Sequence, residues 1–254
     1  MIKFFRKIRQ DLLSGGQTGK YLKYAIGEIV LVVIGILIAL QINTWNEEQK
    51  ANKLENVYLQ RLKKDLVADT LYLTKRLRYV KEERTKIYNF IHEIYNTQTT
   101  EEEFKRLFSM QSFDAENLVM QTSTFEELKS TGLIDIIQNE SIKIAMIDLY
   151  REYVVSAEHF NEINYFTANS HFAKSAHVAS KYFNPDLYDE KGLFEGTDWT
   201  FINDPSSENF KLLENTQGGY FIKYGFFIGH FENLISKSKS LIGQLNEELI
   251  ERKK

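Results

Sequence analysis

The sequence predicts an all-α protein in which one transmembrane helix continues into an extracytoplasmic antiparallel helical bundle. Three observations support this fold class. Only 2 prolines and 13 glycines occur in 254 residues, and so few helix breakers favour long helices. An uninterrupted apolar run lies near the N-terminus, and apolar residues recur at three- and four-residue steps over much of the remaining chain, as on one face of a helix.

Composition and charge exclude several classes of protein. Hydrophobic residues make up 43% and charged residues 26%, which is typical of a folded chain. The absence of cysteine excludes disulfides, thiolate metal sites and cysteine nucleophiles. The net charge of −3 argues against general nucleic-acid binding. Residues 1–45 hold six bases and two acids, about +4, whereas the remainder holds 26 bases and 33 acids, −7.

The apolar run from Ala25 to Ile42 predicts the membrane anchor. Its eighteen residues span about 27 Å as a helix, close to a hydrocarbon core of about 30 Å. The alternatives are a buried soluble helix and a cleaved signal peptide. A signal peptide usually has a shorter apolar region and a small-x-small cleavage site, which QINTW after Leu40 does not offer. We therefore predict an uncleaved signal anchor.

The charge asymmetry predicts the topology and the three parts of the chain. Bases precede the span, so the positive-inside rule places the N-terminus in the cytoplasm and the chain after Trp45 in the periplasm. The expected parts are a basic amphipathic cytoplasmic segment at 1–23, a transmembrane helix at 24–45 and an extracytoplasmic helical domain at 46–254.

Basic and aromatic residues flank the span as they do at membrane interfaces. Upstream, Ile2, Phe5 and Ile8 follow helical spacing and predict a helix lying in the inner leaflet. The alternative is that the bases only orient insertion. The expected membrane-interface residues are Lys3, Arg6, Lys7, Arg9, Lys20, Tyr21, Lys23, Tyr24 and Trp45.

The stretch from Lys3 to Glu47, above all YAIGEIVLVVIGILIALQINTWNE, resembles the N-terminal hallmark of an uncharacterised family of bacterial single-pass inner-membrane proteins. That family carries a domain-of-unknown-function label. The resemblance is specific over about 45 residues and general over the rest. It implies an inner-membrane anchor and a bacterial envelope setting, and it implies nothing about chemistry.

Glu28 lies about one turn inside the span, where a charge costs up to about 3 kcal/mol at the centre and less near the edge. One hypothesis is that its helix face associates with another span, because small residues let helix backbones approach and a polar group prefers a protein partner. The alternatives are that the hydrocarbon begins at Ile29 and Glu28 reaches water beside Lys23, or that Glu28 serves a proton or ion pathway. The candidate association residues are Gly27, Glu28, Gly35, Ala39 and Asn43.

Helical periodicity continues after Trp45 and predicts a helix to Tyr95. The predicted core stripe is Leu59, Leu62, Leu66, Leu73, Leu77, Val80, Ile87, Ile91 and Ile94. The charged residues between these positions are predicted to form a solvent-exposed surface: Lys63, Lys64, Lys75, Arg76, Glu82 and Glu83.

Two short helices are predicted next from their capping signals. Thr100 and Glu103 form a capping box for a helix to Ser109. A second helix begins at Ser123 or Thr124, with Glu126 and Glu127 at capping positions, and ends at Gly132.

Two longer helices complete the predicted domain. One runs from Ser141, after Asn139, to Phe183, and if the first long helix runs outward this one is expected to return. An irregular stretch at 184–205 and a short helix to Asn215 follow. The pair Gly218-Gly219 is predicted to be a hinge or helix start, before a last helix to about Glu251. The predicted apolar stripe of the Ser141 helix includes Ile144, Ile147, Tyr150, Val154, Phe160, Ile163 and Phe166. If that helix returns, residues 184–231 lie near the membrane. Their aromatics, including those of 220–231, are then expected in the core, and the alternative is that they touch the outer leaflet.

No motif predicts catalysis. The five histidines form no i,i+4 pair, and the chain has no G-x-S-x-G, phosphate-binding loop or dinucleotide fingerprint. Acidic runs have capping explanations. We therefore expect no enzyme, no catalytic, cofactor-binding or metal residues, and no cofactor, although distant residues can still gather in space.

The expected function is that of a membrane-anchored scaffold or accessory subunit that engages other envelope proteins through its external helices. The alternative is an extracytoplasmic ligand-sensing bundle that signals through a partner. The expected partners are the lipid bilayer and, through the transmembrane helix, other membrane proteins or a second copy, with no nucleic acid.

Overall fold

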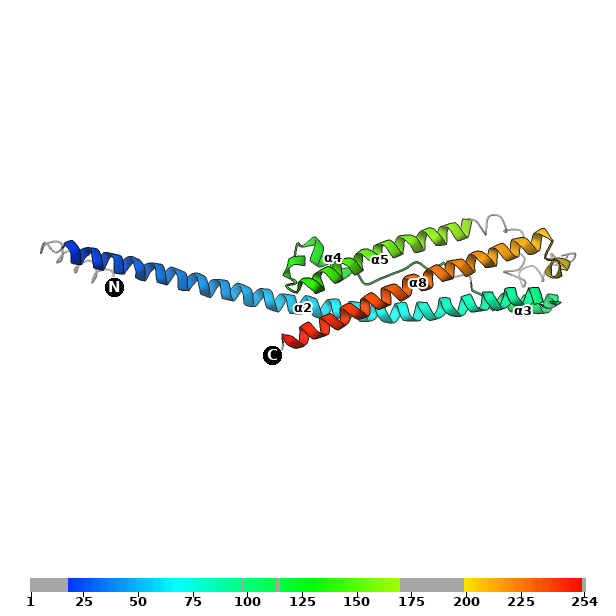
Figure 1. The fold of residues 1–254 in the computed structure, drawn as a ribbon, viewed down its shortest axis with the longest axis horizontal. Helices are drawn as coiled ribbons and strands as arrows, with labels where there is room; N and C mark the ends of the chain where they lie inside the picture. The colour runs from blue at the N-terminus through cyan, green and yellow to red at the C-terminus, as the bar shows by residue number, and fades with distance from the viewer. Residues whose placement is uncertain (1–17, 97, 113–114, 170–198, 253–254) are drawn as a thin grey trace, which may run out of the picture. The chain divides into compact units, whose positions relative to one another are not determined.

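The structure is a computed structural model that describes residues 18–96, 98–112, 115–169 and 199–252. All regular elements in these ranges are helices (Figure 1). The chain divides into two compact units, Met1–Val57 (unit 1) and Tyr58–Lys254 (unit 2). The elements are α2 (Thr18–Asn96), α3 (Glu101–Ser109), α4 (Ser123–Ser130), η1 (Ile134–Ile136), α5 (Glu140–Thr167), η3 (Thr200–Asn203) and α8 (Glu208–Glu251).

Helix α2 contains no proline and ends at Asn96, one residue after the predicted end. Its predicted core stripe is confirmed. Leu77 and Ile91 are partly buried, and the other members of the stripe are buried: Leu59, Leu62, Leu66, Leu73, Val80, Ile87 and Ile94.

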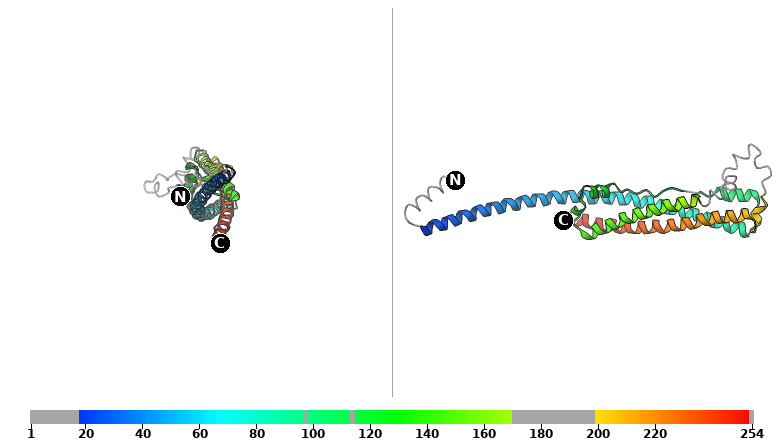
Figure 2. Two further views of the ribbon diagram at one scale, coloured as in Figure 1. Left: turned by 90° about the vertical axis from the view of Figure 1, so that its left-hand side faces the viewer. Right: turned by 90° about the horizontal axis from the view of Figure 1, so that it is seen from above.

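Unit 2 packs three long helical segments around an apolar core. Helices α5 and α8 are antiparallel, because Asn139 before α5 donates to Glu248 near the end of α8 at 2.8 Å. Helix α8 is also antiparallel to α2, since Tyr95 donates to Glu214 near the start of α8. Helices α2 and α5 therefore run in the same direction (Figures 1 and 2).

The expectation that the Ser141 helix returns is thus wrong. The chain returns instead through an extended stretch after α3, described at 111–112 and 115–122, which we call the return segment. Because this stretch crosses back along α2, α5 can start beside the Tyr58 end of the unit and run parallel to α2.

Local capping residues fix several helix ends. The Thr100 side chain accepts from the Glu103 N–H at 3.2 Å, as predicted for the start of α3. The Asn139 side chain accepts from the N–H groups of Ser141 and Ile142 at the start of α5. Gly132, which follows α4, has φ +71°, a left-handed conformation that favours glycine.

The buried face of α5 agrees with the predicted one only in part. Tyr150 and Phe160 of the predicted stripe are buried, and Ile147 and Ile163 are partly buried against the core. The other three members of the stripe are exposed: Ile144, Val154 and Phe166. The core also includes buried residues that the stripe did not contain: Ile142, Met146, Leu149 and Tyr153. The stacking of Phe160 on Phe227 of α8, with ring centroids 3.8 Å apart, accompanies this orientation. Residues 170–198, which include the predicted end at Phe183, lie outside the described residues.

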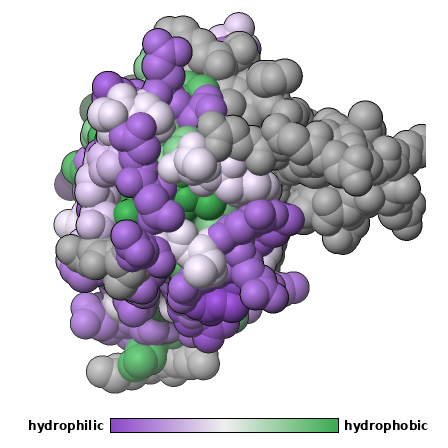
Figure 3. Space-filling view, turned by 90° about the vertical axis from the view of Figure 1, so that its right-hand side faces the viewer, coloured by the Kyte–Doolittle hydropathy of each residue, from purple (hydrophilic) through white to green (hydrophobic). Residues whose placement is uncertain are grey.

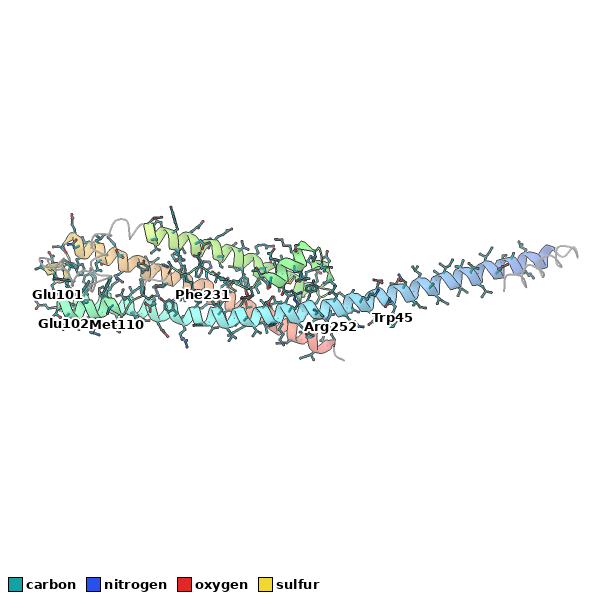
Figure 4. The ribbon with its side chains drawn as sticks, turned by 180° about the vertical axis from the view of Figure 1, so that it is seen from behind. Trp45, Glu101, Glu102, Met110, Phe231 and Arg252 are labelled. Atoms are coloured by element: carbon teal, nitrogen blue, oxygen red, sulfur yellow. The ribbon has the colours of Figure 1, made fainter. Side chains whose placement is uncertain are left out.

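Helix α8 is continuous through Gly218 and Gly219, so the predicted break there is wrong. Gln217 and Tyr220 on either side are buried in unit 2, and tertiary packing outweighs the weak helix propensity of glycine. The prediction that the following aromatics lie in the core is correct for most of them. Tyr220, Tyr224, Phe227 and Phe231 are buried (Phe231 is labelled in Figure 4). Phe221 is partly buried, and Phe226 is exposed.

A second, smaller core lies where α3, η3 and the start of α8 meet the end of α2. It is largely aromatic: Phe90 and Phe104 pack edge to face at 5.5 Å, and Phe104 packs similarly against Trp199. The face of the molecule in Figure 3 is mostly hydrophilic, with small hydrophobic areas between polar side chains.

Candidate membrane-spanning segment and polar contacts of unit 2

The apolar segment of α2, residues 25–42, is exposed. By length and composition this part of the helix could cross a membrane, and none of its apolar window is buried. Ten valine, leucine and isoleucine side chains between positions 29 and 40 are exposed. Soluble proteins rarely expose such continuous apolar surface, and an exposed apolar run of this length is typical of segments that contact lipid or another protein.

The candidate association face lies on this segment. Glu28 is partly buried, whereas Gly27, Gly35, Ala39 and Asn43 are exposed. A methyl group built at Gly27 or Gly35 meets nothing within 4 Å.

The flanking residues are described in part. Lys23 is exposed, and the Trp45 side chain, 62% exposed, is labelled on α2 in Figure 4. Lys20, Tyr21 and Tyr24 belong to α2, but their side chains lie outside the described part of the structure. Lys3, Arg6, Lys7 and Arg9, with the rest of the predicted amphipathic segment, lie outside the described residues altogether.

In unit 2, carboxylates of α2 bind the return segment. Glu83 accepts from the Ser112 N–H at 2.7 Å, and Asp69 accepts from the Gln121 N–H at 2.9 Å. Asp65 accepts from the Thr124 hydroxyl where the segment enters α4. An extended stretch outside a sheet must find other acceptors for its N–H groups, and these side chains supply them.

Glu83 and Arg76 correct the prediction for the surface of α2. Glu83, predicted to be solvent-exposed, is only 2% exposed, and the Arg76 side chain is largely buried against Glu116. The return segment covers this flank of the helix. The missed signal was position: Asp69 and Glu83 each lie three or four residues from core leucine, valine or isoleucine residues on both sides.

Asp69 is the most perturbed carboxyl in this region. Burial raises its pKa to about 6, against the opposing effect of the hydrogen bond from Gln121. Its second oxygen is buried without a hydrogen bond in the described part of the chain. Burial also raises the pKa of Tyr150 and Tyr153, whose raised values include a contribution from the Asp69 charge.

Glu127 was predicted to cap α4 and instead joins that helix to α2. It forms an ion pair with Arg61 at 2.5 Å and accepts from the Tyr58 hydroxyl at 2.8 Å. The hydrogen bond from Arg61, followed by that from Tyr58, holds the pKa of Glu127 below its usual value. Thr122 before α4 makes no side-chain cap.

Two histidines meet between α5 and α8. The rings of His159 and His230 are 5.3 Å apart, and His230 Nδ1 lies 3.1 Å from the Ser156 hydroxyl. Spacing within one helix could not reveal this pair. Burial lowers the pKa of His230, and His159 adds to the effect. Among the described residues, no three histidine, aspartate or glutamate side chains come close enough to hold a metal ion.

Comparison with known proteins places the chain in a family. The family described as "Family of unknown function (DUF6090)" matches residues 28–199, about two thirds of the chain. The chain belongs to DUF6090. This confirms the sequence-based expectation of an uncharacterised family.

The DUF6090 match starts at Glu28, inside the apolar segment, and includes the carboxylates that bind the return segment. Helix α8, which completes the core of this DUF6090 protein, follows the matched region. Neither a curated protein nor a solved structure matches the chain.

Proposed function

We propose that this DUF6090 protein is a single-pass protein of the bacterial inner membrane that acts as a scaffold or accessory subunit. In this proposal the N-terminus is cytoplasmic, α2 crosses the bilayer, and unit 2 is a periplasmic helical bundle that engages other envelope proteins. The observation that carries the proposal is the exposed apolar segment at residues 25–42.

The free energy of transfer supports a lipid environment for this segment. Removing an exposed valine, leucine or isoleucine side chain from water contributes about 1.5–3 kcal/mol when burial is complete. Ten such side chains between positions 29 and 40 are about half exposed. Lipid burial would therefore contribute on the order of 10 kcal/mol, more than the roughly 3 kcal/mol cost of Glu28.

Charge supports the orientation. The excess of about +4 in residues 1–45 lies mainly before the span, whereas the rest of the chain carries −7. Basic flanks remain preferentially on the cytoplasmic side.

A topology reporter tests the location. A reporter active only in the periplasm should work when fused after Lys254 and fail when fused before Met1. A cytoplasmic reporter should give the opposite pattern with the same two fusions, which controls for expression. Periplasmic activity at the N-terminus, or cytoplasmic activity at the C-terminus, would contradict the proposal.

Crosslinking in native membranes followed by affinity capture tests the scaffold role. The tagged full chain should capture specific envelope proteins, in amounts nearly equal to its own. A fragment of residues 1–57 with the same tag should not capture them. Recovery of the tagged chain without any other envelope protein would contradict the scaffold role and favour a free-standing receptor.

A further inference from the structure

The outward faces of α2 and α5, opposite the core of unit 2, carry residues at regular three- and four-residue steps. Helical residues at these steps share one face. On α2 this row, the α2 stripe, comprises Gln60, Lys64, Val67, Leu71, Thr74 and Arg78. On α5 the corresponding row, the α5 stripe, comprises Ile144, Asp148, Arg151, Val155, Glu158 and Glu162.

Both stripes are exposed and both contain apolar residues. Leu71 is 69% exposed, Ile144 54% and Val155 40%. Beside Val67, a groove of about 780 Å³ opens between α2 and the end of α8, lined in part by Leu249. Exposure of these apolar side chains to water is unfavourable, and a second surface packed against them would bury them.

The stripes carry opposite charges. The α2 stripe has Lys64 and Arg78, and the α5 stripe has Asp148, Glu158 and Glu162 with one base. Lys64 and Glu162 form no ion pair with any described residue. Arg78 reaches Glu82 only at 3.9 Å, and Asp148 pairs with Arg151 at 3.1 Å on an exposed surface, so both remain accessible. Potentials of opposite sign favour the contact of one stripe with the other.

Equal heights on the two helices can be assigned from shared contacts. Gln121 bonds both Asp69 of α2 and Tyr150 of α5, although the latter contact is long at 3.5 Å. Glu116 likewise contacts both Arg76 of α2 and Asn164 of α5. The residue numbers in these two pairs differ by 81 (Tyr150 and Asp69) and by 88 (Asn164 and Arg76). Because both helices run in the same direction with the same rise per residue, one difference in this range applies along their whole length.

A difference of 84 lies in the middle of that range and brings matching residues to one height. Lys64 is then level with Asp148, Leu71 with Val155, and Arg78 with Glu162. A base faces an acid in the outer two layers, and two apolar residues face each other in the central one.

We propose that copies of this chain associate side by side, the α2 stripe of one copy packing on the α5 stripe of the next. The contact is heterologous, because each copy uses a different surface from its neighbour. The paired residues of neighbouring copies already lie at equal height, so one copy is not displaced along the helix axis relative to the next. Neighbouring copies are then related by rotation about an axis parallel to the helices. All copies have the Tyr58 end on the same side. This inference rests on the proposed role of unit 2 as a binding unit, and it is independent of the membrane location.

The chain lacks cysteine, which permits a direct test by crosslinking in the full-length protein. A variant with both Leu71→Cys and Val155→Cys should form a ladder of dimers, trimers and larger species on mild oxidation in native membranes. Leu71→Cys alone and Val155→Cys alone should form none, and mixed single variants with different tags should form only a dimer containing both tags. As a control, Ser130→Cys with Val155→Cys places an exposed cysteine off the stripe and should give no ladder.

Homodimers of Leu71→Cys alone would show that two α2 stripes meet, and would overturn the proposal. So would the absence of any ladder in the double variant. If no ladder forms while capture still retains other envelope proteins, the copy-to-copy contact fails and the scaffold role stands. A reversed topology reporter would refute the membrane orientation and leave the ladder unaffected.

Charge exchange tests the register within the crosslinkable variant. Lys64→Glu with Arg78→Glu should reduce the ladder about tenfold through like-charge contacts. Adding Asp148→Lys and Glu162→Lys should restore most of it, which a general loss of folding would not allow. Lys129→Glu with Lys239→Glu makes the same charge change at exposed positions off the stripes and should leave the ladder unchanged. Failure of the exchanged charges to restore crosslinking, with helical content intact, would refute this register.

Discussion

At the residue scale, the principal feature of unit 2 is the use of buried carboxylates to bind an extended segment. Asp69 and Glu83 occupy positions on α2 where neighbours three and four residues away are core residues, and each accepts a backbone N–H of the return segment. A buried carboxylate is costly unless hydrogen bonds compensate for lost hydration. At Asp69 the compensation is incomplete, because one oxygen has no hydrogen bond among the described residues.

The first prediction concerns the pH dependence that Asp69 confers. Its pKa is about 6 in the folded state and near 3.9 in the unfolded chain, so the folded state binds more protons between these values. Stability from this group therefore rises as pH falls from 7 through 6, by about 1 kcal/mol at pH 5. Asp69→Asn, which cannot ionise, should abolish this rise.

The measurement is the free energy of unfolding of the full chain in detergent at pH 7 and pH 5, followed by circular dichroism. The exposed Asp135→Asn variant is the matched control and should retain the wild-type difference. An unchanged pH difference in Asp69→Asn would show that this carboxyl is not the source.

At the element scale, sequence predicted several helix ends and the buried stripe of α2, but only part of the buried face of α5. Thr100, Asn139 and Gly132 act through groups a few residues away, so their effect can be recognised locally. The face of α5 depends on where α8 packs, and its apolar residues occur around more than one face of the helix. The apolar residues three and four positions from Asp69 can be recognised in the sequence. The return segment that packs over this part of α2 is distant in the chain and cannot be predicted from that spacing.

The second prediction compares two glycines. Gly218 lies inside α8, and a methyl group there meets nothing within 4 Å, so Gly218→Ala should stabilise the protein by about 1 kcal/mol. Gly132 also has open space but φ +71°, so Gly132→Ala should destabilise it by about 1 kcal/mol through backbone strain.

Thermal unfolding of the two full-length variants would measure this contrast. A decrease in stability for Gly218→Ala would indicate that the glycine pair serves a bend or close approach after all. Equal effects at the two positions would contradict the assignment of strain to Gly132.

The third prediction concerns the association face of the apolar segment. If it binds another span, Gly35→Leu should weaken crosslinking between spans, because the larger side chain separates the helix backbones. Val33→Leu changes the opposite face and is the control. Glu28→Ala should be more damaging than Glu28→Gln if hydrogen bonding matters, whereas loss of an ion pair would make Glu28→Gln damaging as well. Wild-type crosslinking in the Gly35 and Glu28 variants would favour the alternative in which Glu28 reaches water at the interface.

At the scale of the whole molecule, the chain combines an exposed apolar segment with a helical unit that has its own core. The helical class and the apolar segment could be predicted, because periodicity and hydropathy are properties of single segments. The parallel course of α2 and α5 could not, because it depends on a return segment that has no periodic signal of its own. Only contacts between distant residues, such as those of Asp69 and Glu83, reveal that course.

The fourth prediction is that the apolar segment remains in the mature protein. The run is longer than a usual signal-peptide core and lacks a small-residue cleavage site. N-terminal sequencing of protein purified from membranes should begin at or near Met1. A start close to Gln41 would contradict the anchor and release unit 2 from the membrane.

The position of α8 in the chain has a consequence for the order of folding. Helix α8 supplies Tyr224, Phe227 and Phe231 to the core between helices that are synthesised well before it. During synthesis at roughly 5–20 residues per second, the apolar faces of α2 and α5 therefore wait several seconds for their third partner. Over that interval the apolar faces of α2 and α5 are exposed in the nascent chain, and the rate at which α8 emerges sets the earliest time at which the core can close.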